Sequence, residues 1–123
     1  MRLDPRLPVD AMCWEMVDGR EAVGLAVNLS PMGVRVERPY TGGPTLRGVP
    51  LQLEVPDVDE VIWAKGEPMF DHVVMVGAEL VRRTGYRIVA AATRDLRILR
   101  ELVFDNYRAQ VATLIYPPLL ARA

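Results

Sequence analysis

Cysteine and histidine are scarce in this chain. Among its 123 residues there is one cysteine, Cys13, and one histidine, His72. A single cysteine excludes a disulfide within the chain and fits a reducing compartment, where Cys13 serves as a small core residue. A Ser-His-Asp or Cys-His catalytic arrangement would have to use His72. We therefore predict that the protein is not an enzyme, and a small hydrolase built on His72 is the least favoured alternative.

A basic excess and long apolar runs are missing as well. The chain has 15 basic and 16 acidic side chains, whereas a surface that binds duplex DNA needs a clear excess of positive charge. No apolar run approaches the roughly 20 residues of a membrane-spanning helix. The first ten residues, MRLDPRLPVD, lack the apolar centre of a secretory signal. We expect a cytoplasmic domain that binds no DNA and does not insert into membranes.

Motifs for metals and nucleotide cofactors are also absent. Asp57, Asp59 and Glu60 share a turn, but their spacing is not that of a calcium-binding loop. The chain contains no Walker A sequence and no GxGxxG after a strand. We predict no catalytic residues, no metal site and no cofactor.

Strand-like runs separated by short turns dominate the first three quarters of the chain. They cover residues 12–17, 22–27, 33–38, 49–55, 60–67 and 72–81. Asp18-Gly19 predicts a tight hairpin, because both residues tolerate positive φ, and a break is expected at PMFD, residues 68–71. Six runs at this spacing predict a small antiparallel barrel rather than βαβ units, and closure of the sheet removes exposed edges.

The last third of the chain has helical periodicity. Apolar residues recur at steps of three and four with charged residues between them, which predicts an amphipathic helix over residues 93–116. Thr93 and Asp95 suit its start, and Pro117-Pro118 ends it. The preceding segment GYRIVAAA is left open between a last strand and a helical turn.

The remaining segments complete a one-domain layout. Pro5 and Pro8 favour extended backbone, so residues 1–10 are predicted to form a mobile arm. The barrel is expected over residues 11–92, and residues 117–123 form a tail after the helix.

A polar turn, NLSPMG, interrupts two apolar strands at residues 28–33. Asn28 offers an amide and Ser30 a hydroxyl, and both groups donate and accept hydrogen bonds. Gly33 permits positive φ and the close approach of a ligand. The same residue types are common in ordinary turns, so the turn alone does not identify a site.

Two arginines in the arm add to this signal. Arg2 and Arg6 are four residues apart, up to about 14 Å in an extended chain. Each guanidinium pairs bidentately with phosphate or with the O6/N7 edge of a purine, and it stacks on bases. The arm and the turn together predict a site for a flat anion.

These two elements resemble the motifs of PilZ domains. RLDPR at residues 2–6 matches RxxxR, and NLSPMG matches (D/N)xSxxG. The order of barrel and helix, Trp63 in VIWA and the strand VGAEL extend the resemblance from Arg2 to about Leu102. The resemblance implies a mainly β fold, a six-stranded antiparallel PilZ-type β-barrel with a C-terminal α-helix.

The resemblance also implies a function, that of a bacterial receptor for the second messenger cyclic di-GMP. Arg2 and Arg6 would bind guanine edges and phosphates and stack on the bases. Asn28 and Ser30 would contact a guanine edge and the ligand backbone, and Gly33 would keep the turn tight. Binding would order the arm and relay the signal to an effector protein. The number of bound ligands and a homodimer are left open.

The alternative is a ligand-independent adaptor of the same fold. It would dock on motility or exopolysaccharide machinery through its helix. The apolar residues that support it, more than one side of a barrel needs, are Tyr107, Val111, Leu114, Ile115 and Tyr116.

Overall fold

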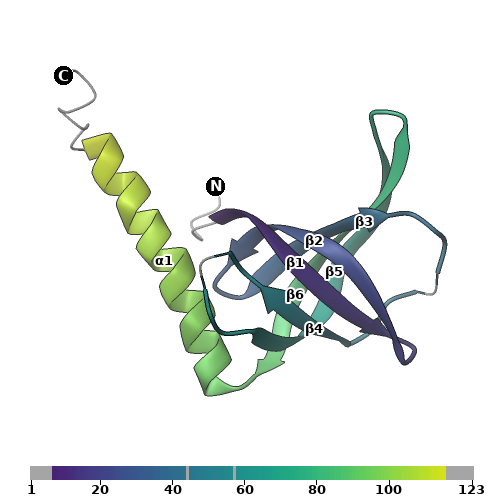
Figure 1. The fold of residues 1–123 in the computed structure, drawn as a ribbon, viewed down its shortest axis with the longest axis horizontal. Helices are drawn as coiled ribbons and strands as arrows, with labels where there is room; N and C mark the ends of the chain where they lie inside the picture. The colour runs from purple at the N-terminus through teal and green to yellow at the C-terminus, as the bar shows by residue number, and fades with distance from the viewer. Residues whose placement is uncertain (1–6, 44, 57, 116–123) are drawn as a thin grey trace.

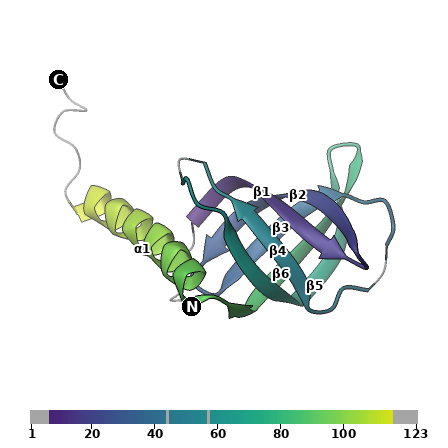
Figure 2. The same cartoon turned by 60° about the horizontal axis from the view of Figure 1, so that its bottom comes forward.

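The computed structural model describes residues 7–43, 45–56 and 58–115, with side chains up to residue 109. The strands are β1 (Leu7–Val17), β2 (Arg20–Ser30), β3 (Gly33–Pro39), β4 (Val49–Glu54), β5 (Ile62–Val76) and β6 (Glu79–Ala91), and the helix is α1 (Thr93–Ile115). The six strands close into one antiparallel barrel in the order β1-β2-β3-β6-β5-β4, and α1 packs at one end (Figures 1 and 2). The expected six-stranded barrel with a C-terminal helix is confirmed.

The predicted hairpin at Asp18-Gly19 joins β1 to β2. Val17 pairs with Arg20, and the two turn residues have φ values of 52° and 75°. Positive φ at both positions is the geometry that matches the right-handed twist of the flanking strands. The local sequence was therefore sufficient to place this turn.

The expected break at residues 68–71 is wrong. β5 runs through Pro68 without interruption, and a register shift between Pro68 and Phe70 accommodates the proline as a bulge. The chain reverses instead at Gly77, whose φ is 61°. The segment GYRIVAAA, left open above, belongs to β6 up to Ala91. Figure 1 shows the end of the β5–β6 hairpin projecting from the barrel.

The first strand begins earlier than the predicted boundary of the arm. Residues 7–10 are strand rather than arm, because Leu7 pairs with Leu29 and Pro8 pairs with Asn28. The buried Leu7 side chain belongs to the core, and this apolar contact holds the segment against β2. Arg2 and Arg6 lie outside the described residues, as does the predicted tail.

The barrel interior is lined by alternate residues of each strand. On β1 the inward residues include Cys13 and Glu15, both fully buried, while Met12 on the outer face is 42% exposed. At the end covered by α1, Leu99 and Val103 join the same core. The helix thus contributes apolar surface that closes one end of the barrel.

Candidate functional site

A cleft of about 360 Å³ lies on the outer surface across β2, β3, β6 and β5. Its lining includes Asn28 and Ser30 from β2, Gly33 and Arg35 from β3, Gly85 from β6, and Met69 and Phe70 from β5. Three of the predicted site residues, Asn28, Ser30 and Gly33, are therefore brought together. The two predicted arginines lie outside the described residues.

The β2–β3 connection places the polar side of the cleft. Ser30 pairs with Gly33 across a two-residue turn, and the Ser30 hydroxyl donates a hydrogen bond to the Gly33 carbonyl at 3.5 Å. A register shift between Ala26 and Asn28 re-aims the end of β2. The backbone carbonyl of Met32 accepts a hydrogen bond of 2.7 Å from the β6 backbone. The turn is thus anchored to the sheet on both sides.

The expectation of positive φ at Gly33 is wrong. The left-handed residues of the described chain are Asp18 and glycines 19, 42, 43, 48 and 77, and Gly33 is not among them. Gly33 is required for a different reason, which is close packing. A Cβ atom built on Gly33 would lie 3.1 Å from Ser30 Oγ and 3.1 Å from the Tyr86 carbonyl oxygen.

We expect Gly33→Ala to lower the free energy of unfolding by about 1–2 kcal/mol, because the added methyl group overpacks this corner. Urea unfolding measures the loss. In a Ser30→Ala background one of the two close contacts is absent, so the same substitution should cost less. An unchanged unfolding midpoint for Gly33→Ala would show that the turn has room for a side chain.

An aromatic side chain forms the opposite side of the cleft. The Phe70 ring lies over Gly85, where an added Cβ atom would be 2.2 Å from Phe70 Cε1. On its own strand, Phe70 stacks on His72 with ring centroids 5.4 Å apart. Because Phe70 is 37% exposed, it presents flat apolar surface beside the cleft. Such a surface suits the stacking of a planar ligand.

Sequence reasoning missed Arg35 and Phe70. Arg35 lies two residues after Gly33 on the same strand, and the alternation of side chains would have placed both on one face. Phe70 had no such signal, because it reaches the cleft only through the pairing of β5 with β6 opposite Gly85.

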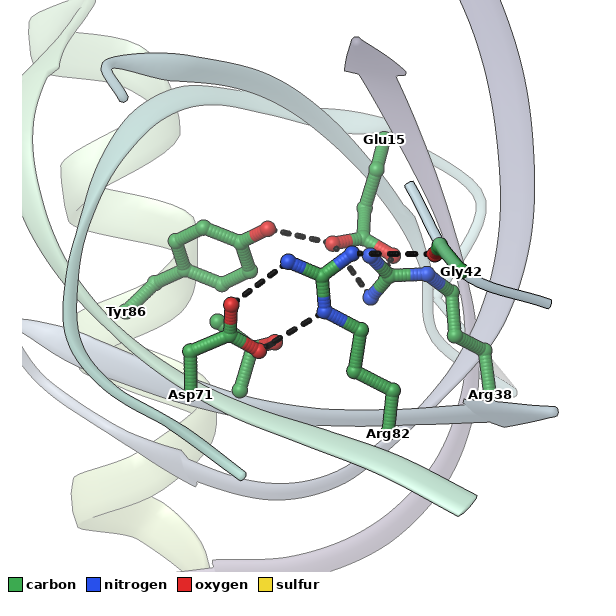
Figure 3. Close-up of polar contacts among 7 residues, drawn as sticks. Glu15, Arg38, Gly42, Asp71, Arg82 and Tyr86 are labelled. Carbon is green, nitrogen blue, oxygen red and sulfur yellow. Dashed lines mark hydrogen bonds and ion pairs between the residues drawn. The ribbon is translucent and has the colours of Figure 1, made fainter. Parts of the chain in front are cut away.

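A buried hydrogen-bonded network in the barrel interior reaches the cleft through Tyr86, which also lines it (Figure 3). Glu15 is fully buried. It accepts a hydrogen bond from the Tyr86 hydroxyl, and its Oε1 lies 3.0 Å from Arg38 Nη1. Burial raises the pKa of Glu15, although the Tyr86 hydrogen bond and the charge of Arg38 act in the opposite direction. Burial also raises the pKa of Tyr86, which stays a hydrogen-bond donor.

A second ion pair lies next to the first (Figure 3). Arg82 Nε donates to Asp71 Oδ1 at 2.8 Å, and the Thr84 hydroxyl donates to the same oxygen at 3.0 Å. The Arg82 hydrogen bond lowers the pKa of Asp71. Asp71 directly follows Phe70 in the chain, so this pair fixes the strand that carries the aromatic side of the cleft.

Other chemistry finds little support in the part of the chain that the structure describes. Within it, no group of three or more His, Cys, Asp or Glu side chains is placed to hold a metal ion. Burial raises the pKa of Cys13, so its thiol stays protonated and unreactive. None of the described helical segments is long and apolar enough to cross a membrane.

Comparison with known proteins gives a structural answer only. No protein-family model matches the sequence. No curated protein matches it either. Solved structures do match, at 15–17% sequence identity for the three described below.

The PilZ domain with c-di-GMP of YcgR from Escherichia coli has a TM-score of 0.62 and 17% identity, covering 94% of this chain and 98% of that one. The Bacillus subtilis inhibitor of motility (MotI/DgrA) has a TM-score of 0.72 and 15% identity, and the match covers 89% of this chain and 52% of that one. The K. pneumonia MrkH–c-di-GMP complex has a TM-score of 0.65 and 17% identity, and the match covers 89% of this chain and 55% of that one.

This chain thus spans about half the length of MotI and MrkH and nearly all of the YcgR domain. The shared features are the closed six-stranded antiparallel barrel and the helix that follows it. The protein has the fold of PilZ domains.

Proposed function

We propose that this protein is a receptor for cyclic di-GMP and that the cleft on β2, β3, β6 and β5 is its binding site. The observation that carries the proposal is the convergence of Asn28, Ser30 and Gly33 on that cleft. Two of the structural matches, the YcgR domain and MrkH, contain c-di-GMP. A flat ligand with two phosphates and two guanines suits a cleft with polar groups on one side and an aromatic ring on the other.

The register of β1 supports a role for the arm. Leu7, the first described residue, pairs with Leu29 in an antiparallel ladder, so the residue that follows Arg6 in the sequence lies opposite the residue that precedes Ser30. Ser30 lines the cleft, so the described chain begins close to it. Arg2 precedes Arg6 by four residues in the sequence, which span up to about 14 Å in an extended chain.

In this proposal each residue has a distinct role. Arg6 and Arg2 bind phosphates and guanine edges, Asn28 contacts a guanine edge, and Ser30 contacts the ligand backbone. Gly33 keeps the strand close enough for that contact. The protein acts by binding rather than catalysis: the ligand covers part of the barrel and changes the surface offered to an effector protein. Such a relay requires that the ligand bind the two states of the arm with different affinities.

Calorimetric titration of the protein tests the proposal. We expect cyclic di-GMP to bind with a dissociation constant of about 1 µM or lower, near −8 kcal/mol. GMP is the matched control, because it has one guanine and one phosphate and should bind at least about tenfold more weakly, since it loses half of the contacts. Absence of heat and of any shift in melting temperature with cyclic di-GMP would refute the receptor.

An adaptor that works without ligand is the second candidate. Exposed aromatic residues favour it, with Trp63 55% and Tyr107 44% exposed. Such side chains are typical anchors of protein interfaces. Size-exclusion chromatography with light scattering measures the molar mass of the protein with and without cyclic di-GMP. The measurement shows whether a homodimer forms and whether the ligand changes it. A complex or dimer that is indifferent to the ligand would favour the adaptor.

A further inference from the structure

Arg35 occupies the middle of the candidate cleft, although it belongs to neither sequence motif. It lies on β3, where it pairs with Asn28 of β2 on one side and with Gly85 of β6 on the other. Gly85 in turn pairs with Phe70 of β5. These four residues form one row across the outer surface, and all four line the cleft.

The hydrogen bonding of Arg35 differs from that of three other arginines on β3 and β6. Arg38 pairs with Glu15, Arg82 with Asp71 and Arg83 with Glu37. By contrast, Nε of Arg35 is buried and has no hydrogen-bond partner among the described residues.

A buried guanidinium N–H without a partner is costly, because it has lost water and gained nothing in return. The cost is recovered when a ligand in the cleft supplies an acceptor and the guanidinium turns to donate to it. Arg35 is therefore available for ligand binding, whereas Arg38, Arg82 and Arg83 already pair with carboxylates.

The neighbours of Arg35 indicate which part of a ligand it meets. The Phe70 ring lies over Gly85, which is the cross-strand partner of Arg35, so planar apolar surface borders the arginine. A nucleobase lying against that surface turns its edge toward the strand that carries Arg35. The guanine edge offers two adjacent acceptors, O6 and N7, which match the two parallel N–H groups of a guanidinium. Adenine places an amino donor where guanine has O6.

We propose that Arg35 is a specificity-determining residue that reads the O6/N7 edge of a guanine resting on Phe70 and distinguishes it from adenine. The inference rests on the proposed binding of cyclic di-GMP at this cleft and adds a third arginine to it. Arg35 is held on strand β3 of the barrel, and it sets base identity.

Titrations of the whole chain with cyclic di-GMP and cyclic di-AMP test this role. Arg35→Ala should weaken cyclic di-GMP binding about ten- to a hundredfold while leaving the weak binding of cyclic di-AMP within about twofold. Arg35→Lys keeps the positive charge but lacks the two parallel N–H groups of a guanidinium, so its affinity for cyclic di-GMP should be little better than that of Arg35→Ala. Unchanged circular dichroism and melting temperature of both variants exclude a folding defect.

The outcomes separate this inference from the receptor proposal. Wild type that binds cyclic di-GMP while Arg35→Ala binds it equally well overturns the role of Arg35 alone. Full rescue by Arg35→Lys, or an equal loss for both dinucleotides, reduces Arg35 to a general positive charge and also overturns it. Wild type that binds neither dinucleotide overturns the receptor and this inference together.

Discussion

Replacing Arg38 by methionine should lower the free energy of unfolding by about 3–5 kcal/mol at neutral pH, the largest stability effect that we expect. Arg38 Nη1 lies 3.0 Å from Glu15 Oε1, and the two side chains are 10% and 0% exposed. Methionine has a similar length and no charge, so the substitution leaves a carboxylate in the barrel interior without its ion-pair partner. Denaturation by urea measures the loss.

The loss of stability in Arg38→Met should depend on pH, because it arises from the negative charge of Glu15. Burial already raises the pKa of Glu15 in the folded state, and the charge of Arg38 opposes that rise. Removing Arg38 therefore raises the folded pKa further. A group with a raised folded pKa contributes stability that is present below the unfolded pKa and lost as pH rises through the folded pKa. We expect the deficit of Arg38→Met to shrink between neutral pH and about pH 5.

The double variant Glu15→Gln/Arg38→Met is the matched control. A glutamine carbonyl still accepts the Tyr86 hydrogen bond, and no unpaired charge remains at positions 15 and 38. Its stability should approach that of the wild type and vary less with pH than that of Arg38→Met. A single Arg38→Met variant as stable as wild type at neutral pH would show that Glu15 is solvated or already protonated there.

Substituting Arg6 by alanine should weaken cyclic di-GMP binding about ten- to a hundredfold, the largest effect that we expect on binding. A hydrogen-bonded charged partner of phosphate or guanine contributes about 1.5–3 kcal/mol. Arg6 directly precedes Leu7 in the sequence, and Leu7 pairs with Leu29, the residue before the cleft residue Ser30. Arg2→Ala should have an effect of the same kind.

Arg100→Ala is the matched control for Arg6→Ala. Arg100 is an exposed residue of α1, so its removal changes the net charge equally without touching the cleft. It should leave the dissociation constant of cyclic di-GMP within about twofold, that is, within about 0.4 kcal/mol. Cyclic di-GMP binding that survives Arg6→Ala unchanged would contradict the role given to the arm, even if the cleft itself binds the ligand.

Local chemistry was sufficient for several elements of the fold. The pair Asp18-Gly19 placed the first hairpin because few other residues adopt positive φ at both positions of a tight turn. Thr93 begins α1 where its capping chemistry predicts. The polar turn before Gly33 joins β2 to β3, as the two flanking apolar runs indicate.

Longer-range features were beyond such reasoning. Pro68 predicts a break in the strand because proline cannot donate to a ladder, but a bulge in the β5–β6 pairing accommodates it. Gly33 was assigned positive φ from its residue type, whereas the carbonyl of Tyr86 is what limits the space there. In both cases the deciding contact comes from β6, whose sequence position is remote.

The sequence by itself determined the Asp18-Gly19 turn and the grouping of Asn28, Ser30 and Gly33, because these depend on residues within a few positions of one another. The count of six strands agrees with the structure, but the boundary between β5 and β6 lies at Gly77 and not at residues 68–71. Only the tertiary structure decided that Arg35 lies between Asn28 and the Phe70 ring and that Glu15 is buried against Arg38 and Tyr86. The alternation of side chains along a strand defines two faces but not which one turns inward. That choice, and the neighbours of each residue across the sheet, follow from closing six strands into one barrel.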